Sequence, residues 1–142
     1  MAKVDPDNEA TFEVCVIPSD LRETRIPKGA ILEQLQRHRF SAHAIFGIKL
    51  ALEEALTNAV KHGNRCDPAK PVTVRYAVTD EKIVVIVRDE GCGFEPDKTP
   101  DPTVPERLPL PNGRGIMLIR AYMDEVYYRD HGREIYFMKR RD

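Results

Sequence analysis

Three polar side chains in the segment "LEEALTNAVKHGN" have types and spacing that suit a chemical site. Glu54, Asn58 and His62 recur every four residues, which places them along one line of a helix. Apolar residues of the same helix form an adjoining stripe, so the polar line lies at the edge of the buried face, where side chains can line a cleft. A carboxylate can orient a nucleophile for phosphoryl transfer, and a carboxamide oxygen suits a hard cation such as Mg²⁺. Taken alone, such a line is more often the ordinary polarity of a solvated helix surface.

A second candidate is the segment "DEGCGF", which directly follows an apolar run. Asp89 could accept hydrogen bonds from an exocyclic amine, and Gly91 and Gly93 permit a tight turn and a close approach of the backbone to a ligand. The alternative is a glycine-rich turn with a solvated aspartate, which is common.

A third candidate is "NGRGIMLI", in which Gly113 and Gly115 lead into a short helix. A helix that begins at glycines presents free N–H groups to an anion such as phosphate, and Arg114 could add positive charge. The loop before it, residues 95–112, holds six of the eleven prolines. Its length favours a lid over a nucleotide, with a surface insertion as the alternative.

The remaining pattern predicts the elements that position these segments. A helix over about 20–38 would begin at Ser19 or Asp20 and break or kink at Pro27. The helix that carries Glu54 would begin after Ser41 and end at Gly63 in the C′ position. Alternating or apolar runs predict five strands, the last two joined at His131-Gly132; their ranges are 11–18, 71–78, 82–90, 125–130 and 133–140. Because hairpins dominate, we expect an α+β two-layer sandwich: a mixed, mostly antiparallel sheet with helices on one face.

Composition narrows the class of protein. A chain of 142 residues is large enough for one domain with a buried core, and a net charge of −1 gives no support for nucleic-acid binding. The polar beginning of the chain is unlike a secretory signal, and no apolar run is long enough for a membrane span. Cys15, Cys66 and Cys92 form neither a metal-binding pair nor a disulfide framework. We therefore expect a cytoplasmic protein with reduced thiols.

Together the three segments resemble the boxes of the GHKL superfamily, the Bergerat ATP-binding fold of histidine kinases, type II topoisomerases and mismatch-repair ATPases. "EALTNAVKHGN" looks like its N box, "DEGCG" like its first glycine box and "GRGIMLI" like its second. The resemblance covers about 11–140 within a single domain, with a lid at about 95–112. Within the superfamily the chain is most similar to the small bacterial anti-sigma-factor serine kinases, of which the N box "LALEEALTNAVKHGN" and the compact second box "NGRGIMLI" are typical. We expect neither the phospho-acceptor hairpin of sensor kinases nor the transducer domain of topoisomerases.

The resemblance implies a role for each matching residue. Glu54 would be the general base and Asn58 the ligand of Mg²⁺, while Asp89 would bind the adenine amine. The glycines would bring the backbone close to the ligand: Gly91 and Gly93 at the base and ribose, Gly113 and Gly115 at the phosphates, with Arg114 beside them. His62 is left between two roles, a phosphate contact and a cap at the end of its helix. The proline-rich lid carries Glu106 and Arg107, and its contacts to the γ-phosphate are not assigned.

The function that the resemblance implies is a protein serine/threonine kinase that uses ATP and Mg²⁺. It would phosphorylate a STAS-type anti-sigma-factor antagonist, bind a sigma factor and form a homodimer. The first alternative is an ATP-gated binding module that transfers no phosphoryl group. The second is an α+β interaction domain with no nucleotide.

Overall fold

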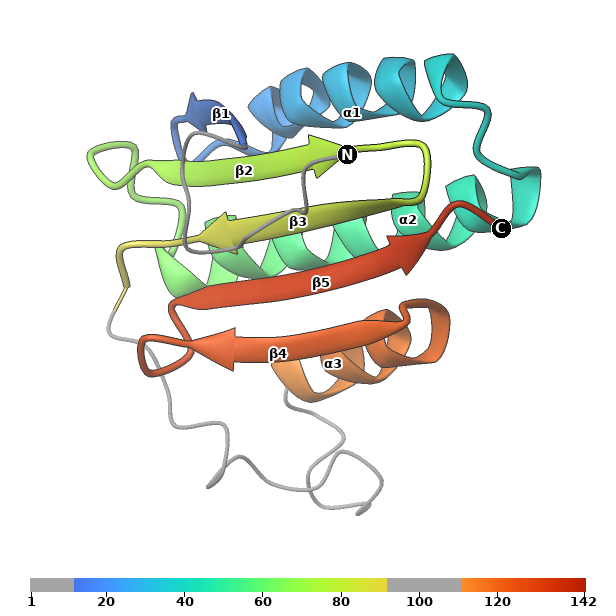
Figure 1. Ribbon diagram of the computed structural model, residues 1–142. Helices are drawn as coiled ribbons and strands as arrows, with labels where there is room; N and C mark the ends of the chain where they lie inside the picture. Colours follow the sequence, from blue (N-terminus) through green and yellow to red (C-terminus); the bar gives the residue numbers. More distant parts are fainter. Residues whose placement is uncertain (1–11, 92–110) are drawn as a thin grey trace.

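Five strands form one sheet in the order β1-β2-β3-β5-β4, and all four neighbouring pairs are antiparallel (Figure 1). The computed structural model describes residues 12–91 and 111–142, except for the side chains of 111–116. The strands are β1 (Glu13–Ile17), β2 (Val72–Val78), β3 (Lys82–Arg88), β4 (Glu125–Arg129) and β5 (Glu134–Arg140). Each predicted strand is therefore present, and β3, the most continuously apolar of them, lies in the centre of the sheet.

The helices cover one face of this sheet, which confirms the two-layer α+β sandwich (Figure 1). They are a short 3₁₀ turn η2 (Leu21–Thr24), α1 (Arg25–Arg37), α2 (Ala42–Thr57), a π-helical turn η3 (Asn58–Gly63) and α3 (Pro111–Tyr122). Ser41 caps α2 as predicted: its Oγ accepts the N–H of Ala44 at 3.0 Å, a contact typically worth about 1 kcal/mol. None of the helices in the described ranges combines the length and the hydropathy that crossing a bilayer requires.

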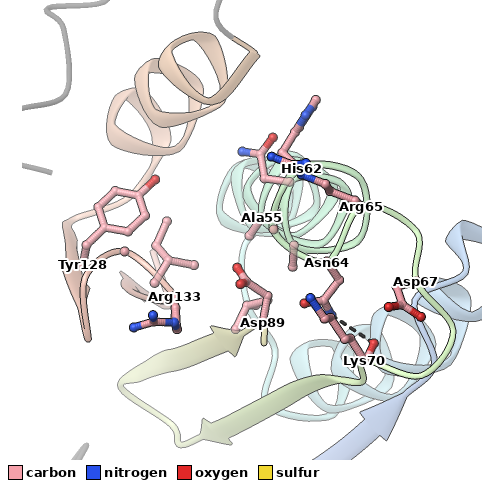
Figure 2. Close-up of a pocket in the computed structure, with 15 residues that line it drawn as sticks. Ala55, His62, Asn64, Arg65, Asp67, Lys70, Asp89, Tyr128 and Arg133 are labelled. Atoms are coloured by element: carbon pink, nitrogen blue, oxygen red, sulfur yellow. Dashed lines mark hydrogen bonds between the residues drawn. The ribbon is translucent and has the colours of Figure 1, made fainter. Parts of the chain in front are cut away.

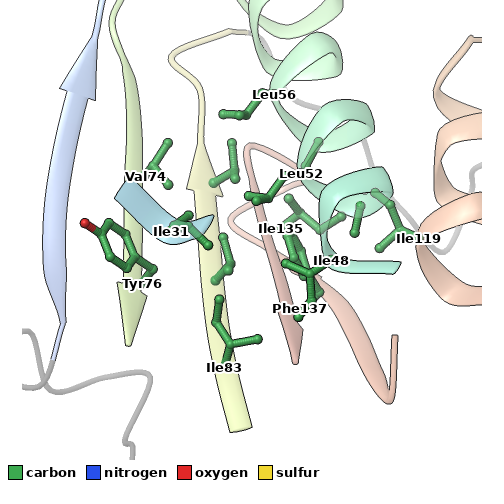
Figure 3. Close-up of a cluster of buried hydrophobic side chains, with 14 of the residues drawn as sticks. Ile31, Ile48, Leu52, Leu56, Val74, Tyr76, Ile83, Ile119, Ile135 and Phe137 are labelled. Atoms are coloured by element: carbon green, nitrogen blue, oxygen red, sulfur yellow. The ribbon is translucent and has the colours of Figure 1, made fainter. Parts of the chain in front are cut away.

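The core lies between the sheet and the helices (Figure 3). Ile48, Leu52 and Leu56 of α2 are 2 % exposed or less and pack against side chains of β3 and β5. The strand β3 is apolar at nearly every position, and its side chains are buried on both faces of the sheet. Ile83, Val85 and Val87 belong to the helix-side core, whereas Val84 and Ile86 belong to a second buried cluster with Phe12 and Tyr136.

Three sequence predictions about the helices need correction. Pro27 does not break a helix, because it lies in the first turn of α1, where a missing N–H costs no hydrogen bond. The segment divides earlier, between η2 and α1, and Asp20 caps η2 by accepting the N–H of Arg22 at 2.9 Å. The helix α3 begins at Pro111, so Gly113 and Gly115 lie inside it rather than before it.

The first strand also differs in detail from the pattern that predicted it. Its face toward the helices carries Cys15 and Ile17, whereas Val14 and Val16 are 56 % and 61 % exposed. Cys15 and Cys66 carry free thiols, as expected, and Cys92 lies outside the described residues. The predicted lid also lies outside them, except for residues 111 and 112, which already belong to α3.

Candidate functional site

A cavity of about 450 Å³ opens where the C-terminal end of the α2 helix meets the ends of β3 and the β4–β5 hairpin. Figure 2 shows its two sides: Tyr128 on the hairpin faces the end of the α2 helix, and Asp89 points into the space between them. The described residues that line it are Ala55, Asn58, Ala59, His62, Gly63, Asn64, Arg65, Asp67, Lys70, Val87, Asp89, Tyr128, Gly132, Arg133 and Ile135. The volume falls within the range of small-molecule sites.

The helix wall of this cavity is not a regular α-helix. From Asn58 to Gly63 the backbone widens into a π-helical turn, a feature frequent at functional sites. The chain leaves it by wrapping back: the N–H of Asn64 reaches the carbonyl of Ala59 at 2.8 Å, and Arg65 and Cys66 adopt left-handed φ angles of 52° and 58°. Gly63 is therefore not the C′ glycine that the sequence suggested, because the left-handed turn falls on the two residues after Asn64.

Asp89 is held at the end of β3 by contacts on three sides. Its N–H donates to the carbonyl of Arg133 at 2.9 Å, and its Oδ1 accepts the N–H of Gly91 at 2.8 Å. On the third side lies Gly63, where a Cβ would stand 2.4 Å from Asp89 Cγ. Burial raises the pKa of Asp89, and the Gly91 N–H and the nearby Arg133 and Arg88 oppose that rise in part. A half-buried carboxylate of this kind is a strong acceptor for a donor that enters the cavity.

Of the three polar side chains Glu54, Asn58 and His62, only two line the cavity. Asn58 and His62 line the cavity, whereas Glu54 lies one turn earlier on α2, half-buried and outside the lining set. His62 is a basic residue in the last turn before the chain leaves the helix, and it also lines the cavity. Both roles of His62, the phosphate contact and the helix cap, therefore stay predictions.

The glycines of the two predicted boxes are only partly visible. Gly91 is described, and its tightest contact is internal: a Cβ there would lie 2.0 Å from the carbonyl oxygen of Gly63. Gly93 lies outside the described residues, and of Gly113, Arg114 and Gly115 the structure describes only their place in the first turns of α3.

Several lining residues were not foreseen from the sequence. Tyr128 and Arg133 come from the hairpin that closes the chain, and they reach the cavity because β5 inserts between β3 and β4. That strand order leaves no local signal in the sequence. Asn64 did have a signal, since it ends the quoted "KHGN", but an Asn after a Gly reads as an ordinary helix stop.

The charges around the cavity favour an anionic ligand with a donor at one end. Cationic side chains at Arg65, Lys70 and Arg133 outnumber the carboxylates of Asp67 and Asp89. Burial also raises the pKa of Tyr128, so its phenol stays protonated at neutral pH.

The described residues of this cavity do not form a metal site made of protein ligands alone. Among the described residues no group of three or more His, Cys, Asp or Glu side chains could hold a metal ion. Mg²⁺ bound with a nucleotide needs only one or two protein oxygens besides the phosphates, and the Asn58 carboxamide is such a donor. The residues present therefore fit a metal that arrives with its nucleotide.

Comparison with known proteins decides the family. The histidine kinase-like ATPase domain matches residues 17–139, which is most of the chain and includes both walls of the cavity. The chain belongs to the histidine kinase-like ATPase family. Membership of this family confirms the resemblance drawn from the three boxes, and it supports ATP as the nucleotide that the domain uses.

Curated relatives within the histidine kinase-like ATPase family cover most of the chain. The serine-protein kinase RsbW of Bacillus subtilis (strain 168) is 30% identical over 132 residues, 87% of this chain and 81% of the relative. The anti-sigma F factor of Clostridium perfringens (strain 13 / Type A) is 29% identical over 139 residues, 94% of this chain and 97% of the relative. The serine-protein kinase RsbW of Listeria monocytogenes serotype 4a (strain HCC23) is 32% identical over 111 residues, 72% and 70% of the two chains.

Proposed function

We propose that this protein is a cytoplasmic, Mg-ATP-dependent protein serine/threonine kinase that acts as an anti-sigma factor. Its substrate would be a STAS-type anti-sigma-factor antagonist, and it would also bind a sigma factor, as a homodimer. The names of the relatives support the kinase and the anti-sigma role. The observation that carries the proposal is the convergence of Asn58, from the α2 helix, and Asp89, from the end of β3, on one cavity of a histidine kinase-like ATPase domain.

Each residue would do one part of the work. Asp89 accepts a hydrogen bond from the exocyclic amine of adenine, and Asn58 contributes an oxygen ligand to the Mg²⁺ that accompanies the phosphates. Glu54, one helical turn from Asn58, takes the proton of the serine hydroxyl of the partner protein. The serine oxygen then attacks the γ-phosphorus, and ADP is the leaving group. The remaining task in such a transfer is positioning and charge neutralisation, to which Arg65, Lys70 and the start of α3 would contribute.

The position of Glu54 favours a second candidate function. Glu54 lies outside the set of residues that line the cavity. This position is compatible with an ATP-gated binding module, because such a module transfers no phosphoryl group and needs no general base. In that case ATP would shape the surface that a partner meets, and no phosphoryl group would move. Family membership argues against the remaining alternative, an interaction domain that binds no nucleotide.

A phosphoryl-transfer assay separates the two candidates. The protein is incubated with Mg-ATP and candidate STAS-domain proteins, and mass spectrometry looks for the gain of one phosphoryl group on a serine or threonine. We expect transfer by the wild type and a loss of about 100-fold or more in rate for Glu54→Ala. The matched control is Glu53→Ala, an exposed neighbour that pairs with Lys28 away from the cavity and should keep the wild-type rate. ATP binding without any transfer would favour the gated module.

A further inference from the structure

Asn64 ends the π-helical turn, and its side chain connects four parts of the chain. The residue is 1 % exposed. Its Nδ2 donates to Ser19 Oγ at 2.9 Å and to the carbonyls of Lys70 and Pro71 at 3.0 Å each. Its Oδ1 accepts the N–H of Glu90 at 2.7 Å. The carboxamide therefore ties the helix end to the link after β1, to the entry of β2 and to the turn after β3.

The orientation of this carboxamide is fixed by its partners. Rotating it by half a turn would place the NH₂ group against the Glu90 N–H and the oxygen against two carbonyls. A buried amide left in that state would lose its hydrogen bonds without water to replace them. Only one orientation satisfies both ends, so Oδ1 is held toward Glu90.

The hydrogen bond to Glu90 bears directly on the candidate site. The Glu90 N–H belongs to the peptide group that follows Asp89, and the Asp89 N–H on the other side donates to the Arg133 carbonyl at 2.9 Å. Both peptide groups that flank Asp89 are thus anchored, one by the Arg133 carbonyl in the turn before β5 and the other by the Asn64 side chain. Together with the Gly91 N–H on Oδ1, they set the direction of the Asp89 carboxylate into the cavity.

We propose that Asn64 is a positioning residue for base recognition: through the Glu90 peptide group it aims the Asp89 carboxylate at the exocyclic amine of the base. This inference rests on the proposed function, in which Asp89 accepts that amine. Ser19 serves a different purpose, since its hydroxyl helps to satisfy Nδ2 and does not touch the Glu90 turn. Substitution of Asn64 therefore tests the orientation of the Asp89 carboxylate, whereas substitution of Ser19 tests only the stability of the polar network.

The choice of nucleotide distinguishes positioning from a general loss of structure. Inosine triphosphate carries a carbonyl oxygen where ATP carries its exocyclic amine, so it offers Asp89 no donor at that position. A protein that is only less stable binds both nucleotides less well by the same factor. A protein whose Asp89 is misdirected loses affinity for ATP and keeps its affinity for inosine triphosphate.

The experiment measures dissociation constants for ATP and for inosine triphosphate by calorimetry, in wild type, Asn64→Ala and Ser19→Ala, at a temperature where each is folded by circular dichroism. In Asn64→Ala we expect the preference for ATP to fall about tenfold, the worth of one hydrogen bond to a charged group. In Ser19→Ala we expect a lower unfolding temperature and the wild-type preference. If Asn64→Ala does not fold, Asn64→Ser takes its place, because its hydroxyl can serve the buried carbonyls and is too short to reach Glu90.

The outcomes are distinct for the two claims. A folded Asn64 variant with the wild-type preference for ATP overturns the positioning role and leaves the ATP site intact. Wild-type protein that binds neither nucleotide, or both equally, overturns the adenine role of Asp89 and with it this inference.

Discussion

Gly63 and Asp89 lie in such close contact that a Cβ at position 63 would stand 2.4 Å from the carboxyl carbon of Asp89. One residue ends the helix of the predicted N box, and the other begins the predicted first glycine box. The absence of a side chain at Gly63 is what allows the two boxes to share one cavity wall. Gly91 repeats the arrangement from the other side, since a Cβ there would lie 2.0 Å from the Gly63 carbonyl oxygen.

Gly63→Ala tests this contact. The new methyl group would displace the Asp89 carboxylate, which is the end of a side chain and can rotate away, so we expect ATP affinity to fall more than stability does. The control is Gly29→Ala in α1, where a Cβ meets nothing within 4 Å. That change should raise the free energy of unfolding by about 0.5–1 kcal/mol and leave ATP affinity unchanged. Wild-type ATP affinity in a folded Gly63→Ala protein would show that the contact has no functional consequence.

Gly91→Ala should affect the fold more strongly, because its Cβ would meet backbone rather than a side chain end. Relief would require the turn after β3 or the π-helical turn to move. We expect a loss of about 1–3 kcal/mol in the free energy of unfolding, the usual cost of overpacking, measured by urea denaturation. A loss no larger than that of Gly63→Ala would mean that this turn is free to shift.

Asp89→Asn should weaken ATP binding and yet stabilise the nucleotide-free protein. Burial raises the folded pKa of Asp89 above its ordinary value of 3.8, so the ionised side chain is disfavoured by folding. The stability that a raised carboxyl pKa contributes is present below the unfolded pKa and is lost as the pH rises through the folded pKa. At neutral pH the variant should therefore unfold at a higher temperature than wild type, and the difference should vanish in acid. Asp80→Asn, an exposed pair partner of His38, is the matched control.

ATP affinity should also depend on the ionisation of Asp89, and it should rise with pH over the range in which the stability of the nucleotide-free protein falls. Only the ionised Asp89 is a pure acceptor for an amine, so wild-type affinity should fall as the pH is lowered through its raised pKa. Calorimetry across this range should show the fall in wild type and a smaller one in Asp89→Asn, whose remaining dependence reports the nucleotide itself. Parallel curves for the two proteins would exclude Asp89 as the group that titrates.

Most of the fold could be predicted from local pattern. Alternating polar and apolar residues and apolar runs predicted the strands, and Ser41 predicted the start of α2. The continuous apolar residues of β3 indicated a central strand. The pattern did not reveal the strand order, because the insertion of β5 between β3 and β4 depends on contacts far apart in sequence. For the same reason Tyr128 and Arg133 were not expected in the cavity.

The candidate site was predicted in its residue types more than in its geometry. Asn58 and Asp89 were expected at one site and do line one cavity. The π-helical turn was not expected, because the four-residue separation of Asn58 and His62 is compatible with both an α-helical and a π-helical turn. Asn64 was overlooked because its hydrogen bonds join segments that only the folded chain brings together.

The most direct test of the central claim is calorimetric titration of the protein with ATP, with and without Mg²⁺, in wild type and in Asn58→Ala. Thr57→Ala, a half-buried neighbour outside the cavity lining, serves as the control. We expect saturable binding that Mg²⁺ strengthens in wild type and in Thr57→Ala, and a loss of the Mg²⁺ effect in Asn58→Ala. The absence of ATP binding in folded wild-type protein, or a Mg²⁺ effect unchanged by Asn58→Ala, would contradict the assignment of this cavity to Mg-ATP.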